Sequence, residues 1–139
     1  MRWCDLDDMR GSMRDLDEFL ERVPARTWQD FAEAATGRAA SYLGKYRQFF
    51  TDWDNAAAPS EVRRAVAAIA VWDLASACAA LAPQDLQESP WRAQYDDAIL
   101  WLRDVATGKA EIAVDWPGWN ETSSSYMWIS RRTMPADWP

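Results

Sequence analysis

The chain has 139 residues, the size of a single domain and long enough to bury one hydrophobic core. It contains no histidine, which excludes an imidazole general base, a Ser-His or Cys-His dyad and a histidine-containing zinc or iron site. A net charge of -7 and a hydrophobic content of 49% exclude a disordered chain and a protein that wraps duplex DNA in basic side chains.

The first residues give no sign of an export signal. They read Met-Arg-Trp-Cys-Asp-Leu-Asp-Asp, which is acidic where a secretory signal would be basic and then apolar. Two uncharged stretches, 65–72 and 74–84, are separated by Asp73, and each is shorter than the roughly 18 apolar residues that span a bilayer. We therefore expect no membrane helix and a reducing compartment, with Cys78 a small core residue and Cys4 incidental rather than a disulfide partner.

The N-terminal third is expected to be helical. Residues 6–13 and 16–23 predict one or two short helices, with the boundary near Gly11 left open. Thr27 then caps a longer helix that ends near Lys45 or a few residues beyond, and a loop follows. The apolar positions of this longer helix recur in steps of three and four, at Trp28, Phe31, Ala35, Ala39, Tyr42 and Tyr46.

Two further long helices follow the loop. Ser60 is expected to cap the first of them, and Pro83 is expected to stop it. Alanine fills about half of the positions from 65 to 82, which lets neighbouring backbones approach and predicts that this helix is central. The last long helix has Ser89 as its cap, Pro90 in its first turn and Gly108 just past its end. Its apolar stripe runs through Trp91, Tyr95, Ala98, Leu102 and Val105.

The pattern predicts an all-α fold, a bundle of about four or five helices over residues 1–109. Residues 110–139 are predicted to form an extended C-terminal arm, in which 110–116 are compatible with a short strand. The bundle core is expected to contain Phe31, Tyr42, Tyr46, Val66, Ile69, Trp72, Tyr95 and Leu102.

The arm is rich in aromatic side chains but shows no helical period, so it cannot form a core alone and should dock on its own bundle or on another subunit. The residues expected to carry this contact are Trp116, Trp119, Tyr126, Trp128, Ile129, Arg131, Arg132, Met134 and Trp138.

The sequence contains no complete catalytic or cofactor motif. The segment from Asp52 to Asn55 begins like a calcium loop but lacks the required glycine and glutamate, so we interpret it as a solvated loop. No phosphate-binding glycine loop and no serine nucleophile elbow is present. Asp73 falls on the apolar side of its helix, where an ion pair with Arg38 or with an arginine of a neighbour is expected. We expect no enzyme activity, no cofactor and no metal.

Four segments, in order, resemble the small head-tail connector proteins of Mu-like phages and prophages. Residues 39–46 are similar to a helix that ends in a Tyr-Leu pair and a basic-Tyr pair, and residues 69–74 to an Ile-Ala, aromatic, Leu helix. Residues 95–109 are similar to a Tyr, Ala, Leu, Ala, Gly-Lys pattern, and residues 128–134 to a closing aromatic, Ser-Arg, Thr-Leu signature.

The resemblance implies a structural protein of the virion neck, also called an adaptor or head-completion protein, made in the bacterial cytoplasm. Such proteins resemble helical bundles that form a ring of about twelve copies beneath the portal protein and extend the DNA channel. Their other neighbour is a neck or tail terminator protein on the tail side. The acidic composition agrees with a lumen that DNA passes through without specific binding. No membrane is expected as a partner.

Two other functions remain open from the sequence. One is a helical protein-binding module, regulatory or antitoxin-like, whose C-terminal tail wraps a partner. The other is an enzyme that uses the acidic clusters with a metal. Gene neighbourhood distinguishes the first from a connector, and a metal titration tests the second.

Overall fold

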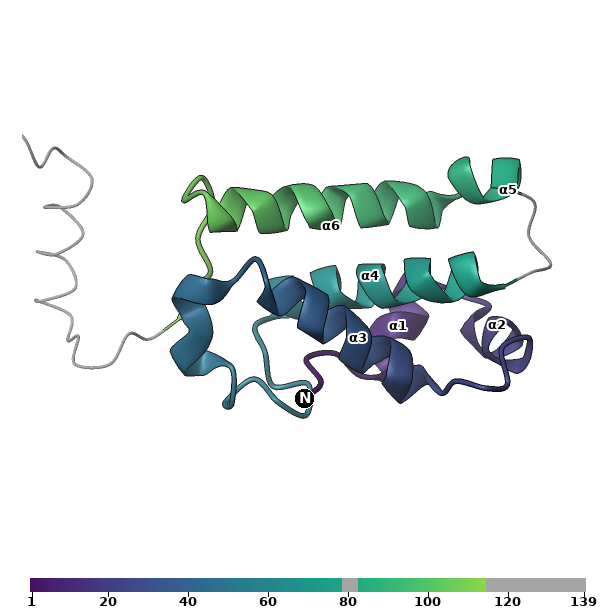
Figure 1. Ribbon diagram of the computed structural model, residues 1–139, viewed down its shortest axis with the longest axis horizontal. Coiled ribbons are helices and arrows are strands. Elements are labelled where there is room, and N and C mark those ends of the chain that lie inside the picture. The colour runs from purple at the N-terminus through teal and green to yellow at the C-terminus, as the bar shows by residue number, and fades with distance from the viewer. Residues whose placement is uncertain (79–82, 115–139) are drawn as a thin grey trace, which may run out of the picture.

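A computed structural model describes residues 1–78 and 83–114. Helices account for all the regular structure of these residues, and no strand occurs among them, which confirms the all-α fold class (Figure 1). There are more elements than expected, because a 3₁₀ helix and a short helix before the last long one join the set. In chain order they are α1 (Leu6–Ser12), α2 (Leu16–Glu21), α3 (Trp28–Ala40), η1 (Gly44–Phe49), α4 (Ser60–Ala77), α5 (Pro83–Gln87) and α6 (Pro90–Ala106).

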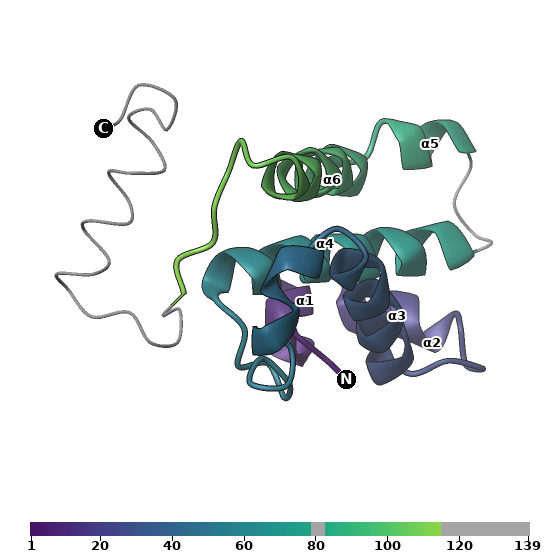
Figure 2. The ribbon, with the colours of Figure 1, turned by 60° about the vertical axis from the view of Figure 1, so that its left-hand side comes forward.

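Helix α4 is the centre of the bundle, as its alanine content predicts. Residues 65–71 are all buried, so this part of the helix lies in the hydrophobic core. It packs against α6, α3, α1 and α2. Figure 2 shows α1 and α3 beneath α4, with α6 above it. Small side chains allow this many neighbours to approach one helix.

Helix α3 begins as expected and ends early. Thr27 and Asp30 form a capping box, in which the Asp30 N–H donates to the Thr27 hydroxyl over 3.3 Å and the Thr27 N–H donates to the Asp30 carboxylate over 2.8 Å. The helix ends at Ala40, whereas the sequence predicts an end near Lys45. The chain then continues as the 3₁₀ helix η1. Because a 3₁₀ helix has three residues per turn, Leu43, Tyr46 and Phe49 lie on the same side, and all three are buried in the core.

Helix α4 begins where the sequence predicts, at Pro59 and Ser60, but its expected cap and its expected end are wrong. Pro59 occupies the position before the helix and Ser60 is its first residue, with no side-chain cap. The helix ends at Ala77, where Cys78 is extended, and Pro83 begins α5 instead of stopping α4. The fixed φ of proline and its missing N–H suit the first turn of a helix, so Pro83 is as compatible with a start as with a stop.

Helix α6 has the boundaries that the sequence predicts. The Ser89 hydroxyl accepts a hydrogen bond from the Arg92 N–H over 3.4 Å, Pro90 follows, and Gly108 has a φ of 86° just past the end. No strand forms over 110–114, the described part of the expected strand. Instead the Ile112 N–H donates to the Tyr46 hydroxyl over 3.0 Å, and the Ile112 side chain is buried. With no strand among residues 1–78 and 83–114 to pair with, the backbone N–H of Ile112 is satisfied by a side chain.

The N-terminal segment lies in the core, which the sequence does not predict. Trp3 is completely buried, with its ring 4.7 Å from that of Phe50 and 5.1 Å from that of Trp53. Cys4 is equally buried, so it is a core residue rather than an incidental one, and Cys78 is buried as expected. Both thiols are free. The aromatic side chains of 48–55, predicted as a loop, therefore form part of the hydrophobic core.

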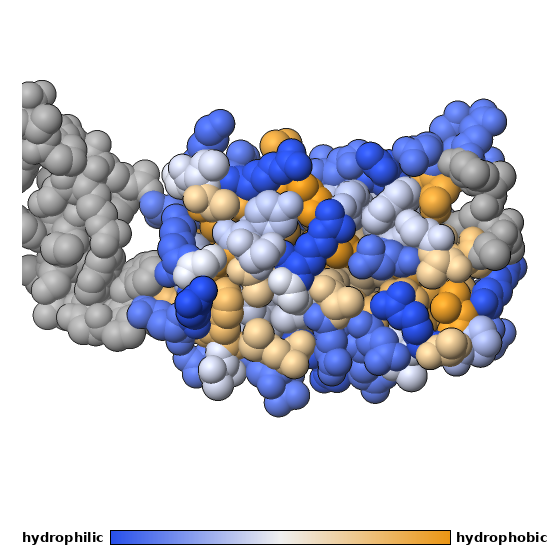
Figure 3. Space-filling model, viewed as in Figure 1, coloured by the Kyte–Doolittle hydropathy of each residue, from blue (hydrophilic) through white to orange (hydrophobic). Residues whose placement is uncertain are grey.

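The surface of the bundle is mixed in character. On the face shown in Figure 3, hydrophilic residues predominate and the hydrophobic ones lie in small groups between them. No helix in the described part of the chain is long and apolar enough to cross a membrane.

Candidate protein-docking groove

Helix α6 has two flanks, and the flank toward α3 is closed by large side chains. Trp72 of α4 lies against Tyr95 of α6, with ring centroids 5.6 Å apart. The Arg38 guanidinium of α3 lies 5.1 Å from the centroid of the Tyr95 ring, and that of Arg92 lies 5.3 Å from the Trp72 ring. These aromatic and cation–π contacts fill the space between the three helices.

The opposite flank, toward α1, is open. A groove with a volume of about 860 Å³ lies between α1, the first half of α4 and the middle of α6. Its lining includes Ala65 and Ala68 of α4 and Ala98 of α6, and their short side chains leave space where the other flank has rings. Trp101 of α6 also lines the groove and is only half-buried. We call this feature the α1–α6 groove.

Acidic side chains predominate along this groove. Asp7 and Asp8 come from α1, Glu61 from α4 and Asp97 from α6, against two arginines of α4. One of these arginines is already neutralised, because Arg63 donates to both carboxylate oxygens of Asp8, over 2.9 and 3.1 Å. The groove therefore presents small apolar surface, one accessible indole and an excess of negative charge.

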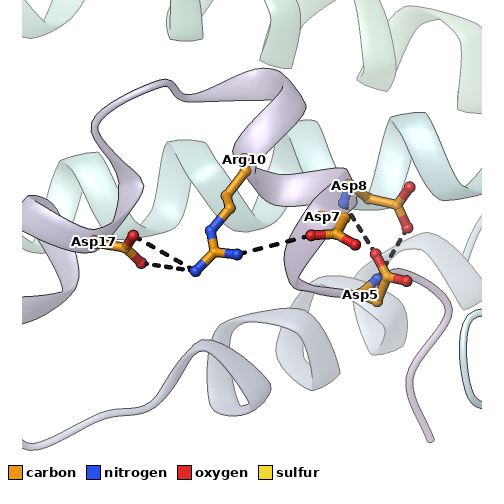
Figure 4. Close-up of polar contacts among 5 residues, drawn as sticks. All are labelled: Asp5, Asp7, Asp8, Arg10 and Asp17. Carbon is orange, nitrogen blue, oxygen red and sulfur yellow. Dashed lines mark hydrogen bonds and ion pairs between the residues drawn. The ribbon is translucent and has the colours of Figure 1, made fainter.

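The acidic cluster at the start of the chain has a structural role. Asp5 and Asp8 form the capping box of α1, in which each carboxylate accepts the other residue's N–H over 3.0 Å (Figure 4). The hydrogen bond from the Asp8 backbone is the main reason why the pKa of Asp5 lies below its ordinary value. Arg10 lies between Asp7 and Asp17, at 3.7 and 3.3 Å, and joins α1 to the start of α2.

The carboxylate of Asp54 fixes the loop before α4. It accepts the backbone N–H of Arg2 over 2.9 Å and that of Asn55 over 2.8 Å, which lowers its pKa. The segment thought to resemble a calcium loop thus ties the N-terminal segment to the bundle. Within residues 1–78 and 83–114, no three Cys, Asp or Glu side chains are grouped so that they could hold a metal ion.

Asp73 does not make the expected ion pair with Arg38. The arginine stacks on Tyr95 instead, and the half-buried carboxylate has no ion pair within the described part of the chain. Burial raises the pKa of Asp73, and Arg38 and Arg26 oppose this only in part.

The expected core residues divide by depth. Phe31, Tyr46, Val66, Ile69 and Leu102 are buried, whereas Tyr42, Trp72 and Tyr95 are half-buried at the edge of the bundle. The residues expected to form the docking arm all lie outside the described residues, namely Trp116, Trp119, Tyr126, Trp128, Ile129, Arg131, Arg132, Met134 and Trp138.

The groove itself is what sequence reasoning missed. A signal was present, because Ala65 and Ala68 are three residues apart and therefore lie on one face of their helix. That face was interpreted as a site of close packing. Whether small residues produce contact or a groove depends on the position of the neighbouring helices, which the sequence pattern does not give.

The segments that resemble phage connector proteins meet in this fold. Residues 39–46 include the end of α3 and the start of η1, residues 69–74 lie in α4, and 95–109 cover most of α6. Helices α3 and α6 both pack on α4, and Trp72 of the second segment contacts Tyr95 of the third. Residues 128–134 lie outside the described residues.

The chain is similar to known proteins at the level of a protein family. No curated protein and no solved structure matches the chain significantly. Residues 6–128, which include α1 to α6 and η1 of the described part of the chain, match the protein family described as Bacteriophage Mu, Gp36. Because this match covers most of the sequence, the chain belongs to the bacteriophage Mu Gp36 family.

Proposed function

We propose that this member of a phage protein family is a head-tail connector, a structural protein of the virion neck that joins the capsid to the tail. In this function, about twelve copies form a ring beneath the portal protein and extend the DNA channel toward a neck or tail terminator protein. The observation that carries the proposal is the family match over residues 6–128, together with the four ordered segments that resemble connector proteins.

The chemistry of the described residues supports a structural function rather than an enzymatic one. The carboxylates that form clusters in the sequence have structural roles: Asp5 and Asp8 cap α1, Asp8 also pairs with Arg63, and Asp54 accepts backbone N–H groups in the loop before α4. A conduit needs no active site. The net charge of -7 suits a channel whose wall repels DNA phosphates, so that the genome slides without binding.

The α1–α6 groove supports a function in protein assembly. Its accessible Trp101, small apolar floor and acidic rim are the features of a surface that binds another polypeptide. Repetition of one such contact around a closed ring would multiply a modest affinity.

Deletion of the gene from its phage or prophage tests the proposal. We expect DNA-filled heads without tails, and recovery of tailed particles when the gene is supplied from a plasmid. Electron microscopy of particles that carry a tagged copy should place the tag between head and tail. Normal tailed particles from the deletion strain would refute the connector function, and altered phage gene expression in that strain would favour the regulatory binding module.

A further inference from the structure

We propose that the α1–α6 groove of one copy binds residues 126–134 from the C-terminal arm of an adjacent copy. The inference rests on the proposed ring and adds the site at which its subunits hold one another. It assigns a partner to a groove that is lined by α1, α4 and α6 and that no described side chain of the same chain fills.

The groove offers two kinds of contact. Ala65, Ala68 and Ala98 leave room for a large apolar side chain beside the indole of Trp101. Glu61 and Asp97 line the same groove as exposed carboxylates, and neither forms an ion pair within the described residues. A partner that brings both apolar rings and positive charge would satisfy the two together.

The segment 126–134 has this composition. Its sequence is Tyr-Met-Trp-Ile-Ser-Arg-Arg-Thr-Met, with five large apolar or aromatic side chains, two arginines and no acidic residue. Trp128 and Ile129 match the apolar floor, and Arg131 and Arg132 match the acidic rim. Arginine suits this position because its guanidinium pairs with carboxylates and also stacks on an indole such as Trp101.

The chain is long enough for this contact. Its course is fixed up to Ile112 by the hydrogen bond to Tyr46. The dozen residues from 114 to 126 can span up to about 40 Å when extended, whereas α6 is about 25 Å long. An arm can therefore reach the groove of a copy beside it. A ring in which every copy gives one arm and receives another leaves no groove empty.

Charge reversal in the full-length chain tests the proposal. The arm variant carries Arg131→Glu and Arg132→Glu, and the groove variant carries Glu61→Lys and Asp97→Lys. A control variant carries Glu21→Lys and Glu33→Lys, two exposed acidic residues of α2 and α3 outside the groove. Self-association is measured by sedimentation velocity, and chymotrypsin cleavage after Tyr126 or Trp128 reports whether the arm is covered.

We expect the wild type to associate as its concentration rises. Chymotrypsin should then cleave the arm at least tenfold more slowly than it does in the dissociated chain. The arm variant and the groove variant should each lose both properties, and the control should keep them. Mixing the two defective variants should restore both, because the reversed arm then meets the reversed groove and the native arm meets the native groove. This rescue requires contact between different copies.

Three results would overturn the proposal. The first is a wild-type chain that neither associates nor protects its arm at any concentration. The second is an arm protected equally at all concentrations, with no rescue on mixing, which would place it on its own bundle. The third is equal loss in the control. Circular dichroism verifies that each variant is folded, and Asp97→Lys alone replaces the double groove variant if that one is not. The connector function is tested separately by the deletion strain, so either idea can fail without the other.

Discussion

The hydroxyl of Thr36 satisfies two backbone groups at once. It accepts the Trp3 N–H over 3.0 Å and donates to the Ala32 carbonyl over 2.8 Å, and the residue is only 1% exposed. The N-terminal segment enters the core at this point, where Trp3 is completely buried. A buried N–H without a partner is costly, so this hydroxyl is required for the segment to stay in place.

Replacing Thr36 by Val should therefore destabilise the fold by about 1–3 kcal/mol, because the buried Trp3 N–H loses its acceptor. Thr36→Ser retains the hydroxyl and is the matched control, with a smaller loss from the missing methyl group. Urea unfolding monitored by tryptophan fluorescence measures both. Equal stability of the Val and Ser variants would show that the hydrogen bond contributes little.

Asp73 gives a prediction of pH dependence. Its pKa is raised in the folded state, so protonation favours folding and the charged form opposes it at neutral pH. Asp73→Asn should stabilise the protein at pH 7, on the order of 0.5 kcal/mol. The difference should shrink as the pH falls through the folded and then the unfolded pKa of the carboxyl. Urea titrations at pH 7 and near pH 4 measure this, with exposed Asp85→Asn as the control. A destabilised Asn variant at pH 7 would contradict the prediction.

At the scale of elements, one hydrogen bond connects the end of the bundle to η1. The Tyr46 hydroxyl accepts the Ile112 N–H, and the two residues are 66 positions apart in the chain. Both side chains are buried. The contact fixes the direction in which the chain leaves α6.

Tyr46→Phe should loosen this connection, at a cost of about 1 kcal/mol. We expect faster hydrogen exchange at the Ile112 amide, with little change in the helical amides of α4. Tyr42→Phe is the control, since the Tyr42 hydroxyl makes no hydrogen bond within the described residues. Unchanged exchange at Ile112 would mean that packing alone holds the segment.

Local chemistry explains which elements could be predicted from the sequence. The start of α3 at Thr27 and the limits of α6 at Ser89 and Gly108 depend on groups within a few residues of each other. The burial of Trp3 depends on Phe50 and Trp53, about fifty residues away, and no local pattern indicates it. The groove is equally non-local, because its alanines line an open space only where α1 and α6 stand apart.

For the whole molecule, the two cysteines report on global opening. Cys4 and Cys78 are free, and neither is more than 3% exposed. Burial and the nearby carboxylates of Asp8 and Asp5 raise the pKa of Cys4 to about 12, so little thiolate exists at pH 8.

Labelling by a thiol reagent at pH 8 should thus be at least about a hundredfold slower in the native protein than in urea. When destabilising variants are compared, the labelling rate should rise as the free energy of unfolding falls. The single variants Cys4→Ser and Cys78→Ser assign each rate. Rapid labelling of either thiol in the native state would show local opening of the core around it.

The alanines of α4 also limit which sequences this fold can accept. Residues 65, 67, 68, 70 and 75 are alanines at most 5% exposed, with α3, α1 and α6 packed around their helix. A larger side chain at one that faces α3 would overpack the core and typically lower the free energy of unfolding by about 1–3 kcal/mol. Enlarging Ala65 or Ala68 would instead extend into the α1–α6 groove. In a saturation library, selection for folding should remove large residues from the first kind of position, whereas selection for particle assembly should remove them from the second.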